Sequence, residues 1–103
     1  MENLILYGYS GFNSIERKEI TKIAHGLPDC GLVLMQDAVF GTNEAGNFVY
    51  EELLSCCSKI FCLKEDALAR GMKEAEICPK MEIIDYGKLI DLMESSNRLI
   101  SWL

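Results

Sequence analysis

Five cysteines are the residues of this sequence with the most direct chemical potential. The reactive form is the thiolate, which needs partial exposure and a positive neighbourhood, such as a helix N-terminus or a nearby Lys or Arg. Cys30 precedes an apolar segment that reads as a strand, Cys56 and Cys57 end a predicted helix, and Cys78 precedes a weaker strand. These positions lie at the amino ends of strands, opposite the edge at which α/β sheets gather their sites.

Two of the thiols remain the best candidates for a reactive role. Cys57 closes a helix, where the negative end of the helix dipole disfavours a thiolate. Cys62 approaches the carboxyl edge of the sheet but lies inside a predicted strand, where a buried cysteine behaves as a small hydrophobe. We therefore expect all five cysteines to be structural, with Cys57 and Cys62 as the candidate reactive thiols if one exists.

No metal site, cofactor site or catalytic set can be assembled from the sequence. It contains no CxxC pattern and one histidine, His25, which reads as a helix cap. The adjacent Cys56 and Cys57 are expected to be reduced thiols. The glycine-containing loop at Ser10–Asn13 could bind an anion, but it lacks both phosphate-binding fingerprints, so an ordinary turn is favoured.

Asp37, with Gln36 beside it, directly follows a buried apolar run. One interpretation is a contact at a binding surface, because sites form at this edge of a sheet. The other is a turn residue whose carboxylate accepts local backbone hydrogen bonds. The sequence favours neither.

The elements that must position these residues alternate regularly along the chain. Apolar runs typical of buried strands are followed by segments with helical spacing of their apolar residues. The predicted strands are Asn3–Gly8, Gly31–Met35, Lys59–Leu63, Met81–Ile84 and Arg98–Leu103. The predicted helices begin at Asn13 or Ser14, at Phe48, at Glu65 and after Asp85, and the polar loop Gln36–Gly46 follows the second strand. This alternation predicts an α/β protein with three α/β/α layers, a mainly parallel sheet of about five strands, and a single domain over residues 1–103.

Composition and charge exclude several classes of function. With 103 residues, half of them hydrophobic and a quarter charged, the chain has the composition of an ordinary globular protein. The formal charge of −6 and the lack of a Lys/Arg cluster argue against direct nucleic-acid binding by this chain alone. No apolar run reaches the length of a membrane span. Without an export signal, five cysteines predict reduced thiols and a cytoplasmic protein.

Three segments in register resemble one known family, the TusB/DsrH family of sulfur-relay subunits. LVLMQDAVF at Leu32–Phe40 resembles its "LLxQDGV" segment, and IFCLKEDALARG at Ile60–Gly71 resembles its "VYALxxDLxARG" segment. The ending at Ile84–Leu103 resembles its "IDYxxFVxLxxxxxxxxSW" pattern, which includes Trp102. In contrast to the family, Ala38 replaces the glycine of the QDG turn, so that turn must avoid a strongly positive φ there.

The resemblance implies the DsrE/DsrF/DsrH-like fold and a place in a sulfur relay. In the Tus branch, a heterohexamer of three related subunits passes persulfide sulfur toward 2-thiolation of the tRNA wobble uridine. In the Dsr branch, a homologous complex works in cytoplasmic sulfur oxidation. The main sulfur-carrying cysteine belongs to the TusD/DsrE-like subunit. The resemblance therefore implies a non-catalytic subunit with TusC/DsrF-like and TusD/DsrE-like partners, or a homo-oligomer.

Two groups of residues are candidates for interface or structural roles. Arg70 is expected to cap its helix with Asp66 as its i, i+4 partner, or else to contact a partner subunit. The apolar residues not assigned to a core stripe are Val39, Phe40, Phe48 and Tyr50, which predict an exposed partner surface. The alternatives to a relay subunit are a flavodoxin-like small-molecule or nucleotide-binding module and a rhodanese-like enzyme acting alone.

Overall fold

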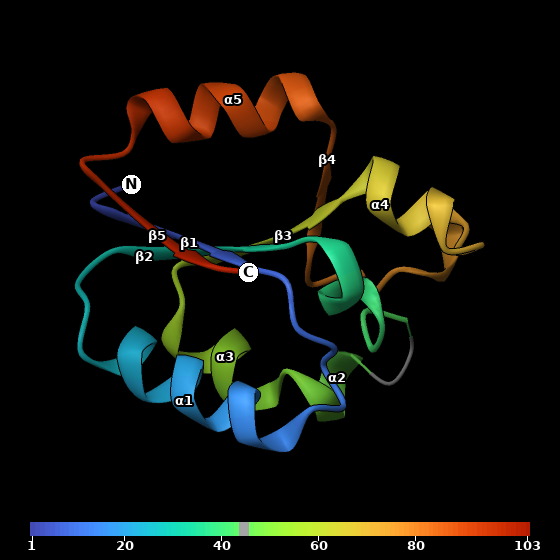
Figure 1. Cartoon of the computed structure of the whole chain (residues 1–103), viewed down its shortest axis with the longest axis horizontal. Helices are drawn as coiled ribbons and strands as arrows, with labels where there is room; N and C mark the ends of the chain where they lie inside the picture. The colour runs from blue at the N-terminus through green and yellow to red at the C-terminus, as the bar shows by residue number, and fades with distance from the viewer. Residues whose placement is uncertain (44–45) are drawn as a thin grey trace.

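Residues 1–43 and 46–103, which the computed structural model describes, fold around an all-parallel five-stranded sheet (Figure 1). The strand order is β4-β3-β2-β1-β5. The strands are β1 Asn3–Tyr7, β2 Cys30–Leu34, β3 Lys59–Leu63, β4 Glu82–Ile84 and β5 Arg98–Trp102. The predicted sheet, with its continuous apolar strands, is therefore confirmed.

Helices cover both faces of this sheet. They are α1 Ser14–His25, α2 Gly46–Val49, α3 Glu51–Cys56, α4 Lys64–Ala69 and α5 Tyr86–Ser95, with short 3₁₀ helices η1 Gln36–Val39 and η2 Glu74–Glu76. Figure 1 shows α1, α2 and α3 below the sheet and α5 above it. Among the described residues, no helix is both long and apolar enough to cross a membrane.

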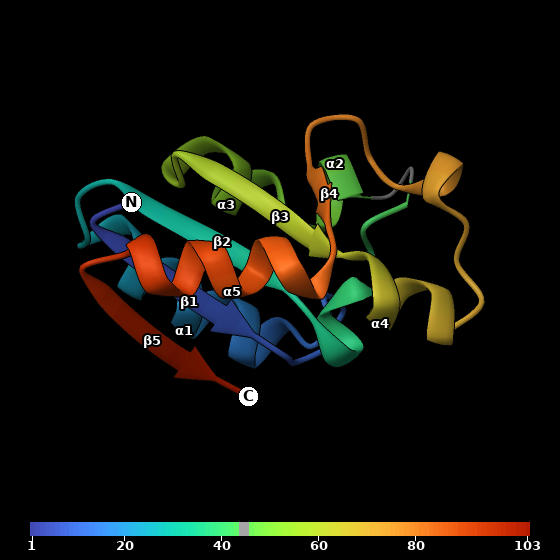
Figure 2. The same cartoon turned by 90° about the horizontal axis from the view of Figure 1, so that it is seen from above.

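The path of the chain explains why α5 lies alone on its face. From β1 to β4 the chain moves along the sheet in one direction, and it then returns from β4 to pair β5 with the far side of β1. Figure 2 shows β5 and β4 on opposite sides of the sheet, with α5 between them. Crossovers between parallel strands are right-handed, so reversing the direction of travel places the connecting helix on the opposite face.

Alternating strand residues supply two cores. Tyr7, Leu34 and Cys62 belong to the core on the side of α1 and α3. Leu6 and Phe61 belong to the core under α5. Because both faces of the central strands are buried, the strands read in the sequence as unbroken apolar runs.

The helix predicted from Phe48 to Cys57 is wrong in one respect, because the structure contains two helices with a break at Tyr50. The ring of Tyr50 is fully buried, and its hydroxyl donates a hydrogen bond to the carbonyl oxygen of Ala38 at 2.6 Å. The predicted loop Gln36–Gly46 also contains η1, and its residues 44 and 45 lie outside the described part of the chain.

The predicted exposed surface needs a second correction. Val39 and Tyr50 are both completely buried, while Phe40 and Phe48 are exposed. Val39 lies in η1, which packs onto the core. An apolar residue outside the helical and strand stripes can therefore still be buried.

Candidate functional site

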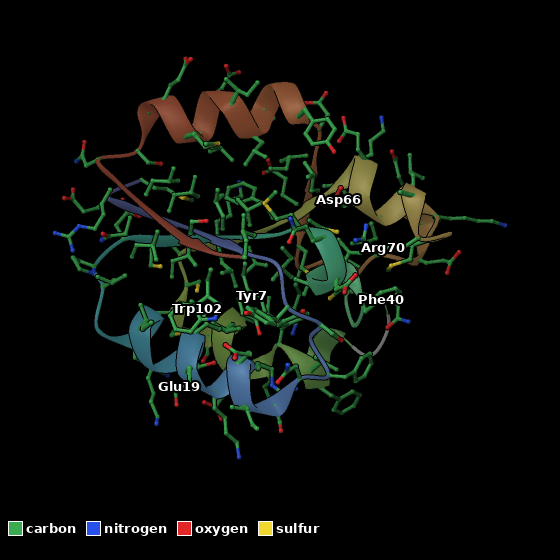
Figure 3. The ribbon with its side chains drawn as sticks, viewed as in Figure 1. Tyr7, Glu19, Phe40, Asp66, Arg70 and Trp102 are labelled. Carbon is green, nitrogen blue, oxygen red and sulfur yellow. The ribbon has the colours of Figure 1, made fainter. Side chains whose placement is uncertain are left out.

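Polar side chains from three neighbouring strand ends meet at the carboxyl edge of the sheet. Gln36 and Asp37 follow β2, Asp66 and Arg70 follow β3, and Tyr86 follows β4. Since β2, β3 and β4 are adjacent and parallel, their carboxyl ends lie side by side. We refer to these five residues as the carboxyl-edge network; Figure 3 labels Asp66 and Arg70 within it.

Arg70 joins the segments that follow β2 and β3. Its Nε donates to Asp37 Oδ1 at 3.1 Å, and its Nη1 donates to the carbonyl oxygen of Asp66 at 3.2 Å. The predicted capping of helix carbonyls by Arg70 is therefore confirmed, but the predicted side-chain pair with Asp66 is wrong. The guanidinium reaches across to Asp37 in η1, and the Asp66 carboxylate accepts from other donors.

Those donors come from elements on either side of α4. The backbone N–H of Gln36 donates to Asp66 Oδ2 at 2.5 Å, and the Tyr86 hydroxyl donates to Oδ1 at 3.4 Å. Gln36 has a φ of 52°, a left-handed conformation that points its N–H toward α4. The positive φ thus falls at Gln36 and not at Ala38, as the alanine at that position requires.

The charged side chains of the carboxyl-edge network interact with one another at the surface. The carboxylate of Asp66 raises the pKa of the Tyr86 hydroxyl, because it disfavours a second negative charge beside it. Among the described residues, the carboxylate of Asp37 bonds to Arg70 and not to a neighbouring backbone N–H group, so the turn interpretation does not account for its side chain. The network holds η1 in one position. It thereby also holds Phe40, the exposed residue at the C-terminal end of η1, which is labelled in Figure 3.

The two candidate thiols are not arranged for nucleophilic chemistry. Cys62 is completely buried in β3, its Sγ lies 3.9 Å from Thr42 Oγ1, and burial raises the pKa of its thiol to about 11. Cys57 is 9% exposed, and a hydrogen bond with the Cys30 thiol raises its pKa strongly. Both groups are therefore protonated at neutral pH, whereas the nucleophilic form of cysteine is the thiolate.

Other predicted site residues have local partners. Trp102, in the edge strand β5, donates from Nε1 to Glu16 Oε2 of α1 at 2.8 Å. In the loop after β1, Ser10 Oγ accepts the N–H of Phe12, and Asn13 caps α1 by accepting the N–H of Glu16. This is the ordinary turn favoured from the sequence.

Tyr86 is the member of the network that sequence reasoning missed. The sequence already placed Tyr86 at the carboxyl edge, because it directly follows the helix cap Asp85 at the end of a predicted strand. What the sequence did not contain is the pairing of this strand with β3, which brings Tyr86 to Asp66.

Fold and site together define a three-layer α/β/α protein with an all-parallel sheet, whose described carboxyl edge carries charged and aromatic side chains and no exposed thiol. Residues 14–98 match the family described as DsrH like protein. The chain is 31% identical over 71 residues to "Protein TusB" of Photorhabdus laumondii and, equally, to that of Pectobacterium carotovorum. In both cases the match covers 69% of this chain and 73% of the relative. The chain belongs to the TusB/DsrH family.

Solved structures agree with the fold. Protein Tm0979 from Thermotoga maritima matches with a TM-score of 0.62 and 29% identity, over 89% of this chain and 91% of that protein. MTH1491 from Methanobacterium thermoautotrophicum, titled a protein of unknown function, matches with a TM-score of 0.66 over 95% of this chain and 99% of its own. At 10% identity, the second likeness concerns the fold alone. The DsrE/DsrF/DsrH-like fold predicted from the sequence is thus confirmed.

Proposed function

We propose that this chain is a non-catalytic subunit of a cytoplasmic sulfur-relay complex of the TusBCD or DsrEFH type. Family membership supports the role of a relay subunit. In this role the chain supports persulfide transfer between its partners toward 2-thiolation of the tRNA wobble uridine. Sulfur oxidation, in the Dsr branch, is the second route that the same family membership accommodates.

The observation that carries the non-catalytic role is the state of the candidate thiols. A sulfur carrier must attack a donor persulfide as a thiolate and then present the new persulfide to an acceptor. Cys62 is enclosed in the core and Cys57 is nearly so, and the pKa of each is raised. The sulfur atom is therefore carried by a related subunit of the TusD/DsrE type.

The carboxyl-edge network gives this chain a surface for such partners. It fixes Asp37 and Phe40 at the end of the sheet without a reactive group of its own. We propose that TusC/DsrF-like and TusD/DsrE-like subunits contact this surface in a heterohexamer, or that copies of this chain do so in a homo-oligomer. With a formal charge of −6, contact with tRNA belongs to a partner.

Mass spectrometry of a reconstituted relay tests the proposal. The chain is mixed with the TusC-like and TusD-like subunits of its own organism and with a persulfide donor. We expect added sulfur on the TusD-like subunit and none in stoichiometric amount on this chain, and slower onward transfer when this chain is omitted. One added sulfur on Cys57 or Cys62, removed by Cys57→Ser or Cys62→Ser, would contradict the non-catalytic role.

A further inference from the structure

Strand β5 leaves one of its two edges open. It is an outer strand of the sheet and, in the described part of the chain, it pairs with β1 alone (Figure 2). Arg98 donates its backbone N–H to the carbonyl oxygen of Glu2 at 2.9 Å, and the carbonyl oxygen of Trp102 accepts an N–H from the residue after β1. Successive residues of a strand direct their backbone groups to opposite edges, so Leu99 and Ser101 point theirs away from β1.

This open edge lacks the features that usually keep an edge strand from pairing. Those features are charged side chains, proline and a short strand. Residues 99–103 contain no charged residue and no proline. The opposite edge strand, β4, has three residues, and its Glu82 forms an ion pair with Lys59 at 2.7 Å. Of these two edges, that of β5 is therefore the one suited to a further strand.

The side chains along β5 are apolar on both faces of the sheet. Leu99 pairs with Leu4, which belongs to the core under α5, so Leu99 points to that face, where it is 45% exposed. Leu103 follows on the same face and lies over Gly8, where an added Cβ would be 2.9 Å from Leu103 Cδ2. On the other face, Trp102 is half-buried on the side of α1 (Figure 3). A neighbouring strand would cover apolar surface on both faces.

We propose that the open edge of β5 is a homodimer interface, along which a second copy of this chain lays its own β5 in the antiparallel direction. This pairing has a two-fold axis and closes at two copies. Pairing of β5 with β4 of another copy would continue without closing, and the short, charged β4 disfavours it. The proposal does not depend on the relay function, and it uses a surface separate from the carboxyl-edge network.

The outward backbone groups favour one register of the two strands. With Ser101 opposite Ser101 of the second copy, Leu99 lies opposite the second copy's Leu103, and the reverse. All of these residues direct their backbone groups outward, so every such pair can exchange hydrogen bonds. Leucine then contacts leucine on one face, and Ile100 contacts the second copy's Trp102 on the other. A register centred on Ile100 would instead place Leu99 opposite Ser101 and lose the leucine pairs.

Sedimentation equilibrium of the isolated chain tests the interface. We expect a reversible monomer–dimer equilibrium in the micromolar range, because one strand pair buries less surface than a standard interface. Ser101→Lys should weaken the dimer at least about tenfold, since it places two lysines opposite each other. Ser55→Lys adds the same charge at an exposed serine of α3 and should dimerise like the parent. Circular dichroism should show that both variants keep the fold.

Cysteine cross-linking tests the register. In the proposed pairing, the two Ser101 Cα atoms lie about 5.5 Å apart, within the range of a disulfide. Mild oxidation of Ser101→Cys should therefore give a covalent dimer that dithiothreitol reverses. The two copies of Leu99 are offset by four residues along the strands, about 13 Å. Leu99→Cys should thus form no more covalent dimer than the parent, which measures the background from the native cysteines.

Tryptophan fluorescence needs no variant. The sequence has one tryptophan, Trp102, and pairing brings Ile100 of the second copy beside its half-exposed ring. Its emission should move to shorter wavelength as the protein concentration rises through the dimerisation range.

Four outcomes would overturn the proposal. They are a parent that sediments as a monomer at high micromolar concentration, a dimer that Ser101→Lys leaves intact, a dimer that Ser55→Lys dissociates, and cross-linking of Leu99→Cys as efficient as that of Ser101→Cys. A chain whose β5 pairs with an unlike subunit and never with its own copy would give the first of these outcomes.

Discussion

Two tyrosines in the larger core differ in what their hydroxyl groups contact. Both rings are completely buried. The hydroxyl of Tyr50 donates to the carbonyl oxygen of Ala38 at 2.6 Å, whereas the hydroxyl of Tyr7 is buried with no hydrogen-bond partner among the described residues. A buried polar group contributes to stability only when it is paired. The Tyr50 hydroxyl should therefore stabilise the fold, whereas the Tyr7 hydroxyl should destabilise it.

The pair of substitutions Tyr50→Phe and Tyr7→Phe measures this difference. We expect Tyr50→Phe to lower the free energy of unfolding by about 1–2 kcal/mol, because it leaves the buried carbonyl of Ala38 without its donor. Tyr7→Phe should change it by less than about 0.5 kcal/mol or increase it. Urea denaturation of the two variants and the parent decides, and an equal loss in both would contradict the assignment.

Tyr7 also predicts a loss of stability in alkali. Burial, aided by the charge of Glu16, raises the pKa of its hydroxyl from 10.0 to about 12. Between these values the unfolded chain releases the proton and the folded chain retains it, so unfolding becomes more favourable as pH rises. The urea midpoint of the parent should fall between pH 10 and 12, and Tyr7→Phe should fall less steeply. Parallel curves for the two proteins would show that Tyr7 titrates normally.

At the scale of elements, Arg70 connects α4 to η1. Its guanidinium pairs with Asp37 at 3.1 Å and donates to the carbonyl of Asp66. Half-exposed ion pairs contribute little, about 0–1 kcal/mol, and the carbonyl bond adds a comparable amount. We expect Arg70→Ala to lower the melting temperature by several degrees.

Lys64→Ala is the matched control for Arg70→Ala. Lys64 is also a residue of α4, but its pair with Glu74 is longer, at 3.6 Å, and the Lys64 side chain is more exposed than that of Arg70. Its removal should leave the melting temperature nearly unchanged. If Arg70→Ala melted like the parent and yet failed to assemble with its partners, the role of Arg70 would be in the interface and not in capping.

The elements themselves were largely predictable, for a physical reason. A parallel strand covered on both faces must be apolar throughout, so the first three strands are visible as unbroken apolar runs. The break at Tyr50 was not visible, because apolar spacing continues across it from Val49 to Leu53. It coincides with a buried tyrosine that bonds to a residue twelve positions earlier, a contact that local periodicity does not contain.

The site was predicted residue by residue but not as an arrangement. Gln36, Asp37, Asp66 and Arg70 were all named from the sequence, yet Arg70 was given the wrong side-chain partner. Asp37 and Arg70 are 33 positions apart, and only the pairing of β2 with β3 brings them together.

At the scale of the whole molecule, the exposed apolar residues indicate where a partner binds. Phe40 is 40% exposed and lies at the end of the carboxyl-edge network. Its backbone is fixed from both sides, because its N–H donates to the carbonyl of Asp37 and its carbonyl accepts the N–H of Gly11. A rigidly held, partly exposed aromatic side chain is typical of an interface anchor.

Phe40→Asp should therefore separate the proposed assembly without unfolding the chain. Co-expressed with its TusC-like and TusD-like neighbours, the parent should elute from size exclusion as a larger complex, since a specific interface buries about 1,000 Å² or more. The aspartate places a charge in that interface but leaves the backbone bonds of residue 40 intact, so circular dichroism and melting should change little. Phe48→Asp, which alters the more exposed aromatic in α2, is the control and should still assemble. Dissociation by Phe48→Asp alone would move the interface to the side of α2. A parent chain that stays monomeric at high micromolar concentration, with its neighbours present, would argue against the relay complex and for a small-molecule module instead.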